Sequence, residues 1–148
     1  MREEVVILMA EDNDGHFALV KRNLVRAGIC NEIIQFRDGK EILEFLFSGA
    51  EISSRKFVAG LPYILILDIR MPKVDGVEVL RRIKKNKELC KMPVAMLTTT
   101  DEPEEIDRCH DLGCNVYLSK PIEYSKFTNA IRKMGLFLSI IQVPEIVE

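Results

Sequence analysis

Little in the sequence points to a membrane or a nucleic acid. The apolar run near the N-terminus, Val5–Ala10, is too short for the core of a signal peptide and far too short for a membrane span. The formal net charge is only −2, so there is no electrostatic case for binding to nucleic acid or to an anionic membrane. We therefore expect a cytoplasmic protein that binds neither.

Cysteine and histidine are also scarce. The 4 cysteines are irregularly spaced, and a cytosolic chain would keep them reduced. Cys109, His110 and Cys114 lie close together and suggest metal ligands, but no second pair completes a zinc tetrad. We expect two of these three side chains to face a helix core instead.

The phosphate-binding loops of nucleotide- and flavin-binding proteins are missing too. There is no GxGxxG motif and no P-loop. Such proteins need Gly, Ser or Thr after the first strand, where backbone amides cradle the phosphate. Here that stretch reads Glu-Asp-Asn-Asp, from Glu11 to Asp14, which would repel an anion unless a metal intervened. Nucleotide and flavin binding are therefore disfavoured.

Apolar runs and amphipathic stretches alternate along the whole chain. Its 148 residues, 47% hydrophobic and 30% charged, suit one soluble globular domain. The patterns predict strands at Val5–Ala10, Glu32–Arg37, Tyr63–Asp68, Pro93–Thr98 and Asn115–Ser119, and helices at Asp14–Gly28, Lys40–Ser48, Asp75–Lys85, Glu102–Leu112 and Glu123–Leu138. Asp14 is the expected N-cap of the first helix, and Gly28 its stop.

Five strand–helix units in series predict an α/β fold, a doubly wound parallel sheet with helices on both faces. The stretch Tyr63–Asp68 is apolar up to its last residue, as is typical of a central strand that is buried on both faces. Ligands of such sheets bind outside the carboxyl ends of the strands. The residues at these ends therefore decide the function.

Carboxylates dominate the predicted strand ends. Glu11 and Asp12 follow the first strand, Asp68 ends the third, and Lys120 follows the fifth. Two carboxylates about 4 Å apart repel each other by roughly 4 kcal/mol at an effective dielectric constant near 20. One lysine does not balance three carboxylates, whereas a divalent cation together with Lys120 does. Oxygen ligands select a hard ion, and so small a set favours Mg²⁺ over Ca²⁺.

These residues, in this order, resemble the receiver domain of two-component response regulators. The resemblance runs from Val5 to Leu138 and rests on Glu11-Asp12, Asp68, Met71-Pro72, Asp75-Gly76, Thr98 and Lys120-Pro121. It implies a flavodoxin-like (βα)5 fold with a five-stranded parallel sheet in the strand order 2-1-3-4-5. The receiver domain would span residues 1–138, and residues 139–148 would form an apolar tail.

The resemblance implies a role for each acid. Asp68 would be the phosphoacceptor, a carboxylate nucleophile that forms an acyl phosphate. Asp12 and Asp68 would bind Mg²⁺ directly, Glu11 would act through a metal-bound water, and the backbone carbonyl of Arg70 would add one more oxygen. The family usually has Asp where this chain has Glu11, and it tolerates Glu because that group acts through water.

The resemblance also implies residues that bind the phosphoryl group and respond to it. Lys120 would contact the phosphoryl oxygens, and Thr98 would turn inward to hydrogen-bond one of them. Three threonines stand in a row, and counting along the strand favours Thr98 over Thr99. Tyr117 matches the aromatic residue whose rotamer follows the threonine, although a half-buried tyrosine that never moves is the alternative.

Two positions near the phosphoacceptor and the threonine would set how fast water attacks the acyl phosphate. They are Arg70 and Thr100, each two residues beyond its reference residue. A bulky Arg70 would shield the acyl phosphate, so we expect a fairly long-lived phosphoryl group.

The C-terminal residues suggest how the signal would leave the domain. We expect a stand-alone receiver, because no linker and no DNA-binding helix-turn-helix follows the last predicted helix. The tail after Gly135 is unusually apolar for an exposed terminus. Together with the long connection after the second predicted strand and the stretch PKVDGVEVLRRIK from Pro72, this tail resembles the small response regulators paired with cyanobacterial-type phytochrome kinases, in which the final helix and tail form a homodimer. A tail that folds back onto its own domain is the alternative.

Three classes of function remain open. The first is a signalling module phosphorylated by a partner histidine kinase, whose only chemistry is phosphotransfer to itself and loss of that phosphate. The second is an aspartate-nucleophile phosphatase, which usually carries an acidic residue where this chain has Arg70, a side chain that cannot donate a proton at neutral pH. The third is a receiver-like module that binds constitutively, but no acid, acceptor or lysine is missing here.

Overall fold

The computed structural model describes residues 5–26, 28–98 and 102–119. Strands and helices alternate, as the sequence predicts. The elements are β1 (Val6–Ala10), α1 (Asp14–Arg26), β2 (Ile33–Phe36), α2 (Gly39–Ser48), β3 (Tyr63–Asp68), α3 (Gly76–Lys85), the short 3-10 helix η1 (Leu89–Lys91), β4 (Val94–Thr98), α4 (Pro103–Leu112) and β5 (Val116–Ser119). The predicted last helix, Glu123–Leu138, and the tail lie outside the described residues.

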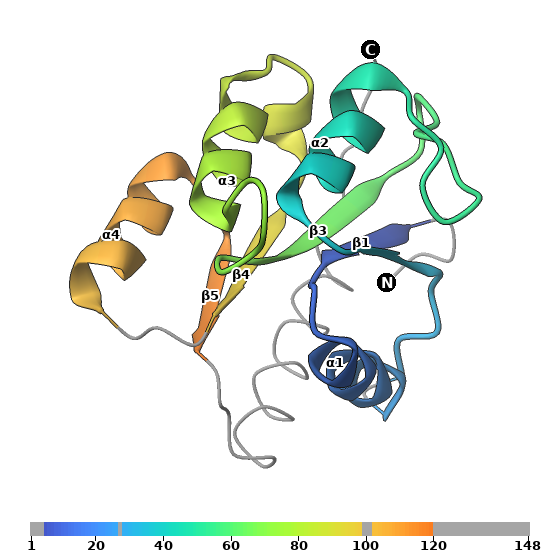
Figure 1. The fold of residues 1–148 in the computed structure, drawn as a ribbon, viewed down its shortest axis with the longest axis horizontal. Coiled ribbons are helices and arrows are strands. Elements are labelled where there is room, and N and C mark those ends of the chain that lie inside the picture. The colour runs from blue at the N-terminus through green and yellow to red at the C-terminus, as the bar shows by residue number, and fades with distance from the viewer. Residues whose placement is uncertain (1–4, 27, 99–101, 120–148) are drawn as a thin grey trace.

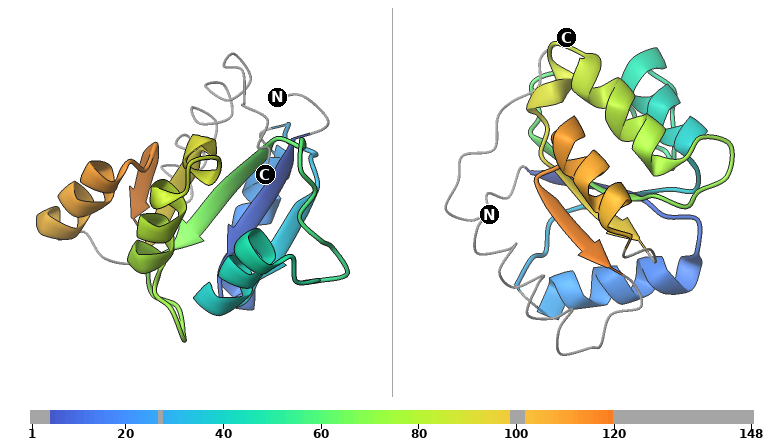
Figure 2. Two further views of the ribbon diagram at one scale, coloured as in Figure 1. Left: turned by 90° about the horizontal axis from the view of Figure 1, so that it is seen from above. Right: turned by 90° about the vertical axis from the view of Figure 1, so that its left-hand side faces the viewer.

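The five strands form one parallel sheet in the order β2-β1-β3-β4-β5, which confirms the predicted fold class and strand order. Helix α1 covers one face of this sheet, whereas α2 and α3 cover the other, with α4 beside α3 (Figures 1 and 2). Within the described ranges, no helix combines the length and apolar character that crossing a membrane requires.

Strand β3 lies at the centre of the sheet and is buried on both faces, as its continuous apolar sequence predicts. Its side chains alternate between two cores because successive residues of a strand point to opposite faces. Ile64 and Ile66 pack on the α1 side, and Leu65 and Leu67 pack on the side of α2 and α3. The strand that carries Asp68 is therefore held rigidly from both sides.

Helix α1 is capped by Asn13 rather than by Asp14, which corrects the prediction. The backbone N–H of His16 donates to Asn13 Oδ1 at 2.9 Å, the usual pattern of an N-cap side chain. Asp14 Oδ1 instead accepts hydrogen bonds from Arg37 Nη1 (2.8 Å) and Gln35 Nε2 (3.2 Å), which lower the pKa of Asp14. The carboxylate of Asp14 is thus held by side chains at and just after the end of β2.

The loop between β3 and α3 folds back closely onto the end of β3. Gly76 N donates to Ile69 O at 2.8 Å, and Asp75 caps α3 by accepting from Glu78 N at 3.0 Å. A Cβ atom on Gly76 would lie only 2.1 Å from the carbonyl oxygen of Asp68. Glycine at position 76 is therefore required by close approach of two backbone segments.

We expect Gly76→Ala to lower the free energy of unfolding by about 1–3 kcal/mol, because the added methyl must push backbone away from backbone. Urea unfolding measures the loss. Gly60→Ala serves as a control, since a Cβ there meets nothing within 4 Å and only the left-handed φ of +91° opposes it. The control should leave the Asp68 amide resonance in place, whereas Gly76→Ala should move it. A Gly76→Ala protein with an unchanged urea midpoint would contradict this packing.

Candidate functional site

Three carboxylates meet at the carboxyl edge of the sheet. Strands β1 and β3 are parallel neighbours in which Ala10 pairs with Leu67, so the residues that follow these two strands reach the same edge. Glu11, Asp12 and Asp68 each offer an oxygen, and these oxygens all lie within 4.8 Å of one another. The predicted convergence of the three acids is therefore confirmed, while the roles assigned to them stay predictions.

The three acids differ in their exposure. Glu11 and Asp68 are 1% and 6% exposed, whereas Asp12 is open to solvent. Backbone N–H groups reach both buried carboxylates: Asn13 N lies 3.3 Å from Glu11 Oε2, and Arg70 N lies 3.3 Å from Asp68 Oδ1. The result is a cluster of three carboxylates in which two are buried and Asp12 faces solvent.

The ends of β1 and β2 fix the position of Glu11. Its backbone N–H donates to Phe36 O at 2.9 Å, and its carbonyl accepts from Gln35 Nε2 at 3.2 Å. His16 Nδ1 lies 3.7 Å from Glu11 Oε1 across the first turn of α1. His16 is not among the predicted site residues. Its position in the first turn of the helix that follows the acids could have indicated that it lies near them.

This donor set fits a small divalent cation. Carboxylate oxygens are hard ligands, and a set of only three leaves the remaining coordination positions to water, as Mg²⁺ prefers. Among the described residues, Glu11, Asp12 and Asp68 form the one group of acidic, His or Cys side chains with metal-binding spacing. A bound cation would relieve a repulsion that the fold itself imposes.

The Cys109–Cys114 segment forms no such group. Cys109 is fully buried and Cys114 is 8% exposed, which confirms that two of these side chains face the core. Burial raises the pKa of Cys109 to about 11, so its thiol stays protonated at neutral pH. Cys114 Sγ lies 3.7 Å from His110 Nδ1, a contact that fits local packing.

Tyr117 and Arg70 lie near the edge of the sheet that carries the acids. Tyr117 in β5 is partly buried, and this burial is the main cause that raises its pKa to about 12, with the charge of Glu105 acting in the same direction. Tyr117 therefore remains a neutral phenol at physiological pH. The guanidinium of Arg70 reaches Glu105 in the first turn of α4, with Nη2 3.5 Å from Oε2. No pattern in the sequence points to Glu105 as a partner of Arg70.

The other predicted site residues are described only in part. Thr98 ends β4, where its backbone pairs with Ser119 of β5. Thr99, Thr100 and Lys120 lie outside the described residues.

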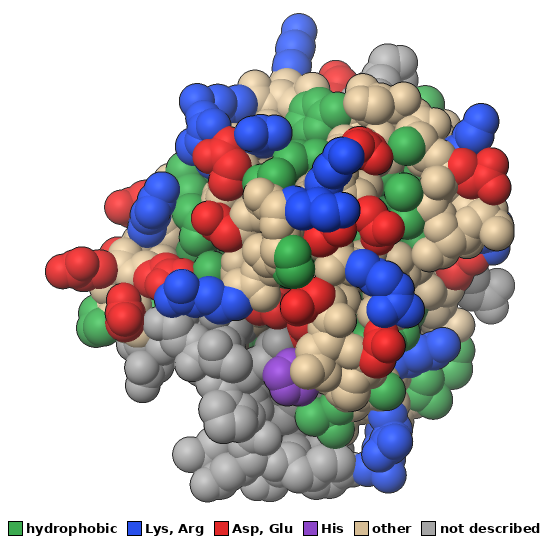
Figure 3. Space-filling view, in the orientation of Figure 1, with side chains coloured by type: hydrophobic (Ala, Val, Ile, Leu, Met, Phe, Trp, Pro, Cys, Tyr) green, Lys and Arg blue, Asp and Glu red, His purple; other side chains and the backbone are tan. Residues whose placement is uncertain are grey.

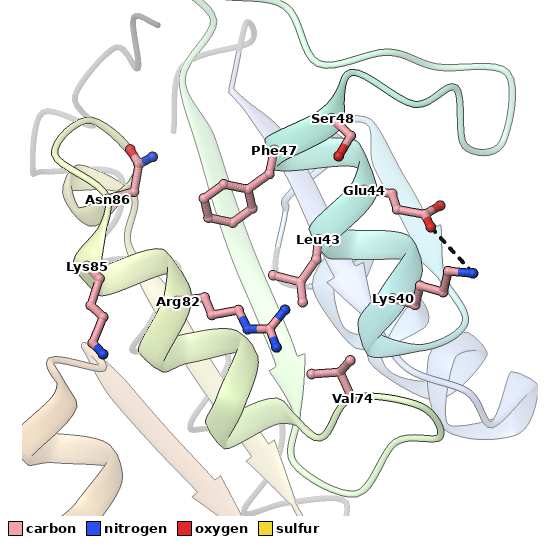
Figure 4. Close-up of a pocket in the computed structure, with 9 residues that line it drawn as sticks. All are labelled: Lys40, Leu43, Glu44, Phe47, Ser48, Val74, Arg82, Lys85 and Asn86. Atoms are coloured by element: carbon pink, nitrogen blue, oxygen red, sulfur yellow. Dashed lines mark ion pairs between the residues drawn. The ribbon is translucent and has the colours of Figure 1, made fainter.

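Among the described residues, two of the hollows lie beside helices α2 to α4. The larger, about 590 Å³, separates α2 from α3 and is lined in part by Leu43, Phe47 and Val74, away from the acids (Figure 4). The other, about 420 Å³, lies beside Arg70 and is bordered by α3 and the start of α4. On the face in Figure 3, acidic and basic side chains are interspersed.

Comparisons with known proteins agree with this geometry. The family described as "Response regulator receiver domain" matches residues 7–132. Among curated proteins, the "Probable methanogenesis regulatory protein FilR2" of Methanothrix harundinacea is 35% identical over 87% of this chain and 80% of its own length. Response regulator Rcp1 of Synechocystis is 36% identical over 78% of this chain and 76% of its own length.

Solved structures of response regulators are also similar to this chain. A response regulator receiver domain from Rhodospirillum rubrum has a TM-score of 0.83 at 44% identity and covers 97% of this chain and 99% of its own. The Mn²⁺-bound form of Rcp1 has a TM-score of 0.80 at 30% identity, covering 94% and 98%. The phosphorylated cyanobacterial phytochrome response regulator RcpA also has a TM-score of 0.80, at 28% identity, covering 95% and 98%.

We expect Mg²⁺ or Mn²⁺ to raise the melting temperature of the protein, because a cation that binds only the folded cluster stabilises it by mass action. Asp12→Asn should abolish the rise, as should Asp68→Asn. Asp14→Asn is the matched control, since Asp14 lies two residues away but pairs with Arg37. A rise that persists in Asp12→Asn would mean that the cation binds elsewhere.

Proposed function

This chain belongs to the response regulator receiver domain family, and from that premise we propose that it is a single-domain response regulator phosphorylated on Asp68 by a partner histidine kinase. The transfer would depend on Mg²⁺, and the phosphoryl group would switch a surface that binds another protein. The chain would act as a phosphoacceptor rather than as an enzyme with an external substrate.

One observation carries the proposal, namely the meeting of Glu11, Asp12 and Asp68 within 4.8 Å at the carboxyl edge of the sheet. Receiver domains bind Mg²⁺ or Mn²⁺ at an acidic pocket of this kind, and the related Rcp1 has been solved with Mn²⁺ bound. The related RcpA has been solved in phosphorylated form. Both likenesses support the same chemistry here.

Asp68 has the position that a nucleophile needs. Strand β3 holds its backbone rigidly, and the neighbouring Asp12 is exposed to solvent, the side from which a donor would approach. A carboxylate oxygen of Asp68 would form a bond to phosphorus while the bond from phosphorus to the donor imidazole breaks, and the imidazole leaves with the electron pair. A bound Mg²⁺ would neutralise charge on the transferring phosphoryl group. Asp12 and Asp68 would hold the cation directly, together with the Arg70 carbonyl, and Glu11 would act through a metal-bound water.

Residues in and after the neighbouring strands would bind the phosphoryl group and respond to it. Lys120 would bind the phosphoryl oxygens as a point charge, and the Thr98 hydroxyl would donate a hydrogen bond to one of them. The side chain of Tyr117 would then change its rotamer in response to Thr98. Thr100 and Arg70 would set how readily water reaches the acyl phosphate.

The relatives suggest the partner. RcpA is described as the response regulator of a phytochrome, so we propose a phytochrome-type sensor kinase as donor and the cytoplasm as the compartment of transfer. We propose further that residues 139–148 join two copies of the chain into a homodimer, because their apolar composition suits a covered surface.

Incubation with acetyl phosphate and Mg²⁺ tests the central proposal. We expect intact-protein mass spectrometry to show the addition of one phosphoryl group, and Asp68→Asn or removal of Mg²⁺ to abolish it. Asp75→Asn is the control, because that carboxylate caps α3 and does not belong to the cluster. Turnover of an added phosphomonoester would identify a phosphatase instead, and a chain with no mass gain would be a constitutive binding module.

Sedimentation tests the dimer. We expect the full-length chain to sediment as a dimer and a chain truncated after Leu138 to sediment as a monomer, since truncation removes the apolar contact. Two monomers would contradict the proposed role of the tail and favour a tail that packs on its own domain.

A further inference from the structure

Arg70 links the phosphoacceptor to helix α4 through two different groups. Its backbone N–H lies 3.3 Å from Asp68 Oδ1, and its guanidinium extends the other way to Glu105 of α4, where Nη2 lies 3.5 Å from Oε2. One residue thus contacts both the acid that would be phosphorylated and the helix beside it.

The side chain of Arg70 is free to change partners. It is 63% exposed, and its contact with Glu105 is long for an ion pair. Such a pair contributes little to the free energy of folding, because water screens it. The side chain of Glu105 is only 17% exposed. The arginine, near the start of the loop between β3 and α3, is therefore the more exposed partner, and the glutamate on α4 is the more buried one.

Two other acids around the same hollow are already engaged. Asp75 caps α3, and the carboxylate of Glu78 is held by Arg81 and Arg82, which lower its pKa to about 2. Within the described part of the chain, Glu105 is the acid for which an ion pair with Arg70 is found. Arg70 therefore lies between two acids, with its side chain at Glu105 and its backbone N–H at Asp68.

Phosphorylation would change the balance of that choice. An acyl phosphate on Asp68 carries more negative charge than the carboxylate and adds three acceptor oxygens. A guanidinium binds such oxygens through two parallel hydrogen bonds, which are stronger than one long contact with a carboxylate. Arg70 already lies beside Asp68, so its side chain needs to turn but its backbone does not.

We propose that Arg70 is a phosphoryl-binding residue that Glu105 holds away from Asp68 until Asp68 is phosphorylated. This inference rests on the proposed function and deepens it. Glu105 is then a positioning residue, which acts on the phosphoryl group only by competing for Arg70. Transfer of Arg70 also leaves Glu105 without its partner at the start of α4, close enough to Tyr117 for the charge of Glu105 to be felt by the phenol.

The lifetime of the phosphoryl group tests this competition. After phosphorylation by acetyl phosphate and removal of the donor, mass spectrometry follows the loss of phosphate from the full chain. We expect Arg70→Gln to shorten the lifetime, because water gains access to the acyl phosphate. Glu105→Gln should lengthen it by about two- to fivefold, the range that corresponds to an exposed ion pair.

The double variant separates positioning from a purely structural effect. If Glu105 acts only through Arg70, then Arg70→Gln/Glu105→Gln must decay at the rate of Arg70→Gln alone. Arg70→Lys should restore part of the lifetime, since it keeps the charge but not the planar fork. Arg108→Gln and Glu104→Gln, which change like residues around the same hollow, should match the wild type.

Two results would overturn the inference. One is a Glu105→Gln lifetime equal to that of the wild type, and the other is an equal effect of Glu105→Gln with and without Arg70. A wild-type chain that gains no phosphoryl group would instead overturn the proposed function, and this inference with it. The two failures are therefore distinguishable in one set of samples.

Discussion

The mutual repulsion of three carboxylates is the interaction on which the site depends. Strands β1 and β3 are parallel and adjacent, so their ends cannot separate Glu11 and Asp12 from Asp68. Two such charges about 4 Å apart cost roughly 4 kcal/mol at an effective dielectric constant near 20. Backbone N–H groups reach the two buried carboxylates, and a bound divalent cation would offset the rest of this cost.

The loop after Asp68 runs from this carboxylate cluster to contacts with three helices, α2, α3 and α4. Lys73 Nζ lies 3.3 Å from Asp38 at the start of α2, and a Cβ atom on Gly39 would lie 1.9 Å from Val74 O. Gly76 closes the loop onto Asp68, and Arg70 reaches α4. A change of charge at Asp68 would therefore act on a loop that contacts several elements. Moving a population from mostly one state to mostly the other takes about 5.5 kcal/mol of differential stabilisation, which charge-assisted hydrogen bonds to a phosphoryl group at ~1.5–3 kcal/mol each can supply together.

The sequence predicted the sheet, its order and the meeting of the acids, because these follow from strand periodicity and from the rule that parallel strand ends share an edge. It did not predict the details of side-chain pairing. The sequence pattern predicts Asp14 as the cap of α1, but Gln35 of β2 and Arg37 just after β2 hydrogen-bond to Asp14, and Asn13 caps instead. Glu105 is separated from Arg70 by more than thirty positions, and only the packing of α4 beside α3 brings them together. Such contacts depend on tertiary structure, which no local pattern encodes.

A crystal structure of the full chain with Mg²⁺ and beryllofluoride, a mimic of the phosphoryl group, tests the central claim most directly. The account predicts a cation bonded to the carboxylates of Asp12 and Asp68, with beryllofluoride on Asp68 and the Lys120 ammonium against its fluorine atoms. A cation bound away from the three acids, or beryllofluoride on another carboxylate, would contradict it.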